Sequence, residues 1–198
     1  LGADGHDFEP IVDELGLEFG ARFVFPHAPV RPVTINGGLP MRAWFDILEL
    51  ERSASWDEQG IRASAEAVAG LIQREIDRGM PSRRVVLAGF SQGGAIALYA
   101  GLRSPLRLAG LMALSSFLPL GETLPAEKSD ANANTPILLA HGDADPVIPL
   151  QMADLSRRLL EAEGYAVDWR VYPMPHAVCA AEIRDIAAWL AGIARADD

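Results

Sequence analysis

The sequence contains little that would favour disulfide bonding, membrane insertion or nucleic-acid binding. Its one cysteine, Cys179, cannot form an internal disulfide, so nothing argues for an oxidising compartment and we expect a cytoplasmic protein. No apolar run approaches the roughly 20 residues that cross a bilayer. The formal net charge of -10, with no basic cluster larger than a pair of arginines, opposes binding to phosphate backbones. We therefore expect neither stable membrane insertion nor a nucleic-acid partner.

Residue patterns typical of cofactor and metal sites are also absent. No Gly-x-Gly-x-x-Gly or phosphate loop occurs, so the sequence implies no nucleotide cofactor. The histidines and aspartates show no short paired ligand spacing, and His-Gly-Asp-Ala-Asp (141–145) alone is poor evidence for a metal. Cys179 follows a histidine by three residues, but we interpret it as a small apolar residue at the start of the last helix rather than a nucleophile. The expected activity needs neither cofactor nor metal.

Short apolar runs rich in β-forming residues alternate with longer stretches of helical period. The predicted strands cover residues 21–25, 84–89, 108–115, 136–142 and 167–173. The predicted helices cover residues 8–19, 60–78, 93–103, 150–163 and 179–195. This alternation predicts an α/β protein with a mostly parallel central sheet and helices on both faces. At 198 residues we expect one domain spanning 1–198.

Two connections between these elements are too long to be simple turns. Residues 26–58 carry many prolines and glycines together with Trp44, Phe45 and Trp56. A connection of this length is usually functional or disordered, and its aromatic content argues against disorder. We interpret it as a pocket wall. The first half of residues 117–135 is apolar and could also line a pocket, while its polar second half is typical of an exposed loop.

A candidate nucleophile lies in the turn between the predicted strand at 84–89 and the predicted helix at 93–103. Gly89, Ser91 and Gly93 have the spacing Gly-x-Ser-x-Gly, between a buried strand and a helix. A turn this tight strains the backbone of its apical residue, so the positions two before and two after must be small. The backbone N–H of Gln92 is the natural first oxyanion donor. The alternative interpretation is a glycine-rich turn that serves helix packing.

A base and an acid follow this serine in the order that such a fold requires, carboxylate before histidine. Of the four histidines, only His176 comes after both the serine and the acids, in a loop between the last strand and the last helix. His141 ends a strand and fits a structural role. Asp143 and Asp145 are the candidate acids. We favour Asp145 because Pro146 holds it in an extended conformation, whereas Asp143 is placed as a turn residue.

The motifs GFSQGG, HGDADPVIP and YPMPH, together with LGADGHDF, FVFPHAPVRPVTINGG, WFDI, LALSSFLPL and EIRDIAAWL, cover nearly the whole chain. In this order they resemble the carboxylesterase, lysophospholipase and acyl-protein thioesterase family of α/β-hydrolases. The resemblance implies a central α/β-hydrolase sheet and, in some members, dimers that pair near the active-site opening. Position by position, it implies Ser91 as nucleophile, Asp145 as acid, His176 as base, Gln92 as oxyanion donor, and Trp44 and Phe117 near the acyl pocket.

The sequence departs from this family at its start. Family members carry a strand that ends in His-Gly before the LGAD segment, and no such strand precedes Leu1 here. The backbone N–H of the leucine at this position is the family's second oxyanion donor, whereas Leu1 would be an amino terminus. Either the given sequence omits residues, or the protein lacks N-terminal strands and half an oxyanion hole. We favour omission, because losing one donor costs about 3 kcal/mol of transition-state stabilisation.

These observations together predict a serine hydrolase that cleaves small-molecule carboxylic esters or thioesters through an acyl-enzyme. Two alternatives remain open at this point. One is a hydrolase of the same fold with another substrate class, such as a peptidase or a lactone hydrolase. The other is a catalytically silent domain that binds a ligand through the same cleft. The acyl-chain preference, the physiological substrate and the oligomeric state do not follow from the sequence.

Overall fold

Four parallel strands form the centre of the protein. The computed structural model describes residues 1–48 and 56–196. The strands are β3 (Val86–Phe90), β4 (Gly110–Leu114), β5 (Ile137–Gly142) and β6 (Val167–Tyr172), and they lie in the order β3-β4-β5-β6. Each neighbouring pair is parallel. The carboxyl ends of all four strands therefore meet at one edge of the sheet, where active sites of open α/β sheets are built.

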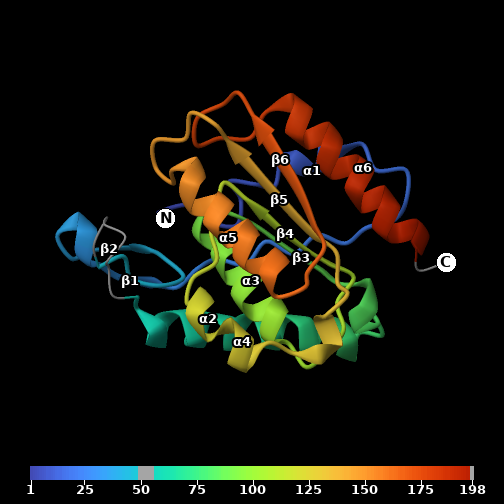
Figure 1. Cartoon of the computed structure of the whole chain (residues 1–198), viewed down its shortest axis with the longest axis horizontal. Coiled ribbons are helices and arrows are strands. Elements are labelled where there is room, and N and C mark those ends of the chain that lie inside the picture. Colours follow the sequence, from blue (N-terminus) through green and yellow to red (C-terminus); the bar gives the residue numbers. More distant parts are fainter. Residues whose placement is uncertain (49–55, 197–198) are drawn as a thin grey trace.

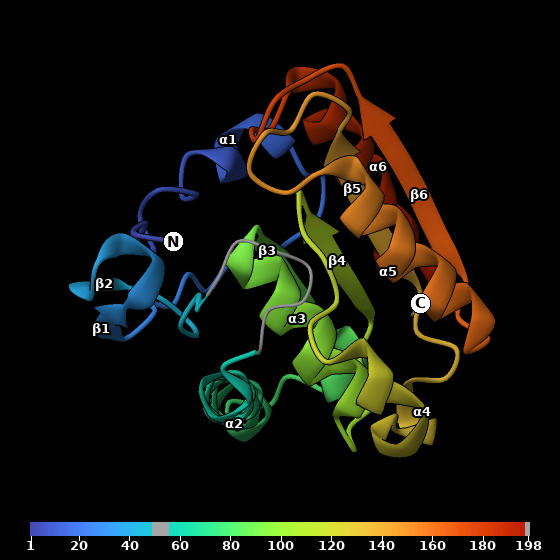
Figure 2. The same ribbon diagram turned by 60° about the vertical axis from the view of Figure 1, so that its left-hand side comes forward.

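Helices cover both faces of this sheet, as the alternation in the sequence predicts. They are α1 (Ile11–Leu15), α2 (Glu58–Asp77), α3 (Gln92–Arg103), α4 (Leu124–Glu127), α5 (Leu150–Ala162) and α6 (Ala180–Ala196). Figures 1 and 2 show α1 and α6 on one face, and α3 and α5 on the other, with α2 packed outside α3. In the described part of the chain, no helix combines the length and the apolar character that a membrane span requires.

Alternate residues of the two inner strands enter two different cores. Leu111 and Ala113 of β4 pack with α2, α3 and α5, whereas Met112 and Leu114 pack with α1 and α6. All five residues of β4 and all six of β5 are buried. Because successive side chains of a strand point to opposite faces, a strand covered on both sides must be apolar throughout. This requirement explains the continuous apolar runs that marked these strands in the sequence.

The beginning of the chain differs from the prediction in two places. The predicted strand at 21–25 is wrong, because this run has no regular secondary structure and pairs with no strand in the described structure. Its apolar character serves packing instead, as Phe23 joins the core between the sheet, α1 and α6. The predicted helix at 8–19 is reduced to α1, which ends at Gly16 in the left-handed conformation with φ 53°.

The two long connections contain short elements of their own. The first holds an antiparallel hairpin of β1 (Val30–Val33) and β2 (Leu39–Arg42), which lies away from the four-stranded sheet (Figure 2). Residues 49–55 of this predicted pocket wall lie outside the described residues. The second connection holds α4 and two 3₁₀ turns, Gly121–Thr123 and Asp130–Asn132.

Candidate active site

Ser91 lies at a strained turn directly after β3. Its backbone has φ 54° and ψ -123°, a combination that residues with a side chain rarely adopt. Such a conformation costs on the order of 1–3 kcal/mol and persists only where the surroundings hold it. The Ser91 N–H donates to the Leu114 carbonyl at 2.8 Å, and the Ser116 hydroxyl donates to the Ser91 carbonyl at 2.7 Å. The predicted strained strand-to-helix turn is therefore confirmed.

The glycines around Ser91 let β3 and α3 approach each other closely. A Cβ on Gly89 would overlap the backbone of Gly93 and Gly94, and a Cβ on Gly94 would lie 2.8 Å from the Gly89 carbonyl oxygen. An added Cβ on Gly93 would meet only Trp44 Nε1, at 3.8 Å, which is an ordinary contact. The expectation that both flanking positions must be small thus holds for Gly89, whereas side-chain space is not limiting at Gly93.

The Gln92 side chain fixes the first long connection to the start of α3. It is 5% exposed, accepts a hydrogen bond from the Trp44 N–H at 2.8 Å and donates one to the Phe45 carbonyl at 2.7 Å. The sequence predicts a role only for the backbone N–H of Gln92, and not for these two side-chain hydrogen bonds. The partners lie 48 and 47 residues away in the chain, so no local pattern reveals them.

Asp145 and His176 are brought together from two different strand ends. Asp145 follows β5 and His176 follows β6, and Asp145 Oδ2 lies 2.7 Å from His176 Nδ1. Asp143, the other candidate acid, is exposed, and its backbone N–H donates to the Tyr172 carbonyl at 2.9 Å. The geometry therefore pairs the imidazole with Asp145, the acid favoured from the sequence.

Asp145 is held as a carboxylate by donors on both of its oxygens. The side chain is buried, which by itself would raise its pKa; the hydrogen bonds from His176, Ile148 and Val147 nevertheless hold the pKa below its ordinary value. The Val147 and Ile148 N–H groups lie 2.8 and 2.9 Å from Oδ1. His141 is buried beneath this turn and its Nε2 lies 2.8 Å from the Ile148 carbonyl, which matches the structural role expected for it.

His176 lies beside the residue that precedes Ser91. Its ring centroid is 4.6 Å from that of Phe90, the last residue of β3. Since Nδ1 faces Asp145, Nε2 is the free nitrogen of the imidazole. The strand ends therefore bring the three candidate residues Ser91, Asp145 and His176 to the same edge of the sheet, with the histidine next to the turn.

The two residues expected near an acyl pocket lie on the α2–α3 side. Trp44 and Phe117 both pack on the core formed by α2, α3 and Phe45, and the Phe117 ring stacks on Trp56 with centroids 5.3 Å apart. Phe90, by contrast, packs on the core with α1 and α6. At the start of the chain Leu1 is exposed, and the next N–H, that of residue 2, donates to the Arg42 carbonyl at 2.8 Å.

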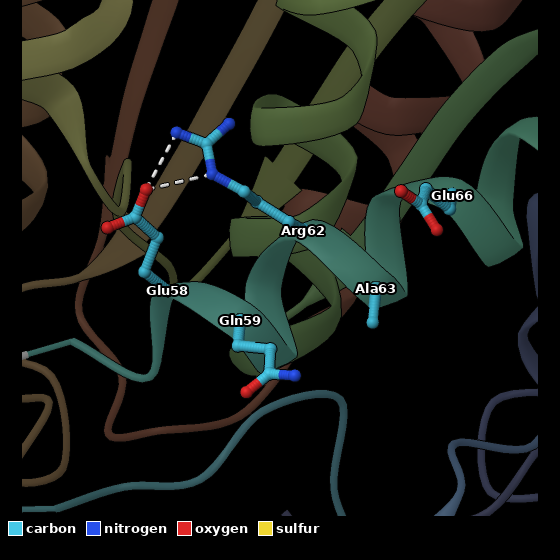
Figure 3. Close-up of a pocket in the computed structure, with 5 residues that line it drawn as sticks. All are labelled: Glu58, Gln59, Arg62, Ala63 and Glu66. Atoms are coloured by element: carbon cyan, nitrogen blue, oxygen red, sulfur yellow. Dashed lines mark hydrogen bonds and ion pairs between the residues drawn. The ribbon is translucent and has the colours of Figure 1, made fainter.

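A cavity of about 400 Å³ adjoins the candidate histidine. Its walls come from the first residues of the chain, α1, the end of β3, the His176 loop and the start of α6. A second, open hollow of about 580 Å³ runs along α2. Figure 3 shows Arg62 turned toward Glu58, with which it forms an ion pair, while Glu66 lies one turn further along the helix. This second hollow contains no nucleophile or histidine. Within residues 1–48 and 56–196, no three His, Cys, Asp or Glu side chains are grouped so that they could hold a metal ion.

Fold and site geometry together define the class of the protein. A parallel sheet covered by helices on both faces, with a strained serine turn after one strand and an Asp–His pair at later strand ends, is the α/β-hydrolase fold. Solved structures agree: Arabidopsis thaliana SOBER1 superposes with a TM-score of 0.93 at 30% identity, covering 98% of this chain and 95% of that one. Zea mays acyl-protein thioesterase 2 gives 0.85 at 29% identity, covering 98% and 90%.

Sequence comparison then identifies the family. Residues 1–193 match the phospholipase/carboxylesterase family, and the chain belongs to it. Acyl-protein thioesterase 1 of Neurospora crassa is 41% identical over 203 residues, which are 96% of this chain and 82% of that protein. Acyl-protein thioesterase 1 of Mycosarcoma maydis is 42% identical over 183 residues, which are 85% and 76%. The protein is therefore a hydrolase of the carboxylesterase and acyl-protein thioesterase type.

Proposed function

We propose that this single-domain protein, spanning 1–198, cleaves carboxylic esters or thioesters through a Ser91-His176-Asp145 triad and an acyl-enzyme. Ser91 attacks the acyl carbonyl while His176 Nε2 accepts its proton. Asp145 accepts a hydrogen bond from His176 Nδ1–H and stabilises the imidazolium. Water then cleaves the acyl-enzyme with the same histidine as base, and no cofactor takes part.

The observation that carries this proposal is the Asp145–His176 hydrogen bond of 2.7 Å beside the strained turn of Ser91. The Asp145 carboxylate fixes one tautomer of the imidazole and leaves Nε2 unprotonated, as a general base requires. The strain at Ser91 is stored at the residue that must present its hydroxyl to the cleft.

The remaining site residues follow from the turn and from family resemblance. The backbone N–H of Gln92, at the first position of α3, is the proposed oxyanion donor, and the resemblance assigns a second donor at Leu1. We assign Trp44 and Phe117 to the acyl side of the site, since both are aromatic and pack on the α2–α3 core. The names of the relatives favour an acylated thiol as substrate. A cytoplasmic location and a homodimer stay predictions.

A fluorophosphonate probe tests the nucleophile. We expect the protein to be labelled and Ser91→Ala to abolish the labelling. Two matched controls should keep the labelling. Ser104→Ala removes a hydroxyl at the opposite end of α3 from Ser91, whose hydrogen bonds are to Leu106 two residues along, and Cys179→Ala removes the rival nucleophile. Labelling that survives Ser91→Ala would exclude the triad, and no labelling of the intact protein would favour a silent binding domain of the same fold.

Substrate class is tested separately. Esters of p-nitrophenol with increasing acyl length, assayed beside an acyl thioester, a lactone and a peptide amide, distinguish the proposed activity from the lactone-hydrolase and peptidase alternatives. We expect turnover of the esters and the thioester. Turnover of only the lactone or the amide would assign the protein to another substrate class.

A further inference from the structure

The cavity beside His176, hereafter the His176 cavity, is open and has both polar and apolar walls. Phe8, Ile11, Phe90 and Ile183 are among its lining residues. The Phe8 and Phe90 rings pack with centroids 5.2 Å apart, and Phe90 in turn contacts the His176 ring at 4.6 Å. Its volume of about 400 Å³ lies within the range of small-ligand sites. The proposed general base is therefore part of the wall of a ligand-sized cavity.

This cavity lies on the side of the site where a leaving group would depart. In acyl transfer, the histidine that accepted the nucleophile's proton returns it to the leaving atom, so the leaving group lies against the imidazole. The His176 cavity contains that imidazole and adjoins α1 and α6, whereas Trp44 and Phe117 pack on the α2–α3 side of the sheet. The residues expected near the acyl chain and the His176 cavity thus pack on opposite faces of the sheet.

The charge around the His176 cavity is negative. Asp7 and Glu14 are exposed at its rim, and no lysine or arginine lines it. Within the described residues, neither carboxylate takes part in an ion pair; Asp7 Oδ2 accepts the Asp4 N–H at 2.6 Å. Residues 1–18 contain no lysine or arginine. Their acidic residues are Asp4, Asp7, Glu9, Asp13, Glu14 and Glu18. A cation entering the cavity would therefore be attracted, and an anion repelled.

We propose that the His176 cavity binds the leaving-group part of the substrate, and that this part is a cationic peptide segment, with lysine or arginine next to the acylated cysteine or serine. The apolar stems of lysine and arginine can pack on Phe8 and Phe90 while their charged ends reach Asp7 and Glu14. This inference rests on the proposed function and narrows its substrate class.

The chemical step balances without any further reactant. When the tetrahedral intermediate collapses, the bond between the acyl carbon and the leaving sulfur or oxygen breaks and its electron pair goes to the leaving atom. That atom receives from His176 Nε2 the proton that Ser91 gave up, and the peptide departs as a neutral thiol or alcohol. The positive charge of its side chains is unchanged, so their attraction to the rim sets how the peptide binds.

Three octanoylated cysteine peptides of equal length test the proposal. They differ only in the two residues that flank the cysteine: lysines, glutamines or glutamates. We expect kcat/KM at 20 mM NaCl to be about tenfold higher for the lysine peptide than for the glutamate peptide, with the glutamine peptide between them. In 500 mM NaCl the ratio should fall toward one, because exposed charges are screened.

The variant Asp7→Asn/Glu14→Gln tests the location of this preference. The readout is the ratio of kcat/KM for the lysine peptide to kcat/KM for the glutamate peptide, measured for each variant. A change in overall activity leaves this ratio unchanged. We expect the ratio to fall to within about twofold, since both rim charges are removed. The control variant Asp13→Asn/Glu18→Gln removes the same number of charges from the same segment outside the cavity lining, and should keep the wild-type ratio.

The outcomes distinguish a failure of the cationic leaving group from a failure of the proposed function. Equal rates for the three peptides at low salt, or a preference that survives Asp7→Asn/Glu14→Gln, would overturn the cationic leaving group. If the double variant does not fold, the salt dependence of the wild-type ratio decides alone. The proposed function fails separately: in that case neither the peptides nor a neutral p-nitrophenyl ester is hydrolysed, whereas ester hydrolysis without charge preference refutes only this inference.

Discussion

Glu182, in the first turn of α6, is a buried carboxyl group without a regular hydrogen bond. It is 0% exposed, and within the described residues neither of its oxygens has a partner at regular hydrogen-bond geometry. Burial raises the pKa of Glu182 to about 7, and the backbone N–H of Cys179 offsets this only in part. The substitution Glu182→Gln keeps the shape of the side chain and removes its charge. We therefore expect this variant to change how protein stability depends on pH.

The size of the effect follows from the two pKa values. Glu182 titrates near 7 in the folded chain and near 4.5 in the unfolded chain, so between these values the folded state binds more protons. The free energy of unfolding consequently falls as the pH rises from 4.5 to 7 and then levels off. At pH 8 the full difference is about 3 kcal/mol, and about 2.5 kcal/mol of it develops between pH 5 and pH 8.

Urea unfolding followed by tryptophan fluorescence measures this directly. The stability of Glu182→Gln minus that of the wild type should increase by about 2.5 kcal/mol from pH 5 to pH 8. Any packing or hydrogen-bonding cost of the glutamine is the same at both pH values and cancels. The control Glu66→Gln, at an exposed position of α2, should show no such increase. If the stability difference for Glu182→Gln is the same at pH 5 and pH 8, the carboxyl is not buried as described and the reasoning is refuted.

Three further predictions concern the serine turn and the Asp–His pair. Asp145→Asn should lower kcat by on the order of 10³- to 10⁴-fold by fixing the wrong imidazole tautomer, whereas the exposed Asp143→Asn should leave it unchanged; steady-state kinetics on a p-nitrophenyl ester checks both. Gln92→Ala should lower the free energy of unfolding in urea by about 1–3 kcal/mol, because the Trp44 N–H and the Phe45 carbonyl lose their partners. A change near zero would show that these two hydrogen bonds do not stabilise the fold. Gly89→Ala should destabilise the protein by more than about 2 kcal/mol because its Cβ overlaps the backbone of α3. Gly70→Ala, at an exposed helix position with open space around it, should instead stabilise the protein by about 0.5–1 kcal/mol. Equal changes in melting temperature for the two variants would contradict this.

Much of the α/β architecture was predictable because its signals are local. Strands buried on both faces are apolar along most of their length, and two such runs became β4 and β5. The outer strands β3 and β6 are only partly buried, and β6 also carries Asp168 and Arg170. The Gly-x-Ser-x-Gly spacing predicted the strained turn at Ser91 because steric crowding acts between residues a few positions apart. The order of serine, carboxylate and histidine also predicted that His176 would be the histidine paired with an acid, since only one order suits this topology.

Strand formation at 21–25 could not be predicted locally. A β-strand needs a neighbouring strand for its hydrogen bonds, and whether one lies alongside depends on distant parts of the chain. Residues 21–25 have strand-like composition but no ladder partner in the described structure, and of their side chains only Phe23 packs on the core with α1 and α6.

By itself, the sequence determined the alternating elements, the identity of the serine turn and the candidates for acid and base, because these depend on side-chain type and short spacing. Only the tertiary structure decided that the Gln92 side chain hydrogen-bonds to residues 44–45, that Asp145 rather than Asp143 reaches His176, and that an open cavity with two acidic side chains adjoins the imidazole. These features join residues tens of positions apart, and their distances exist only once the sheet has brought the strand ends together.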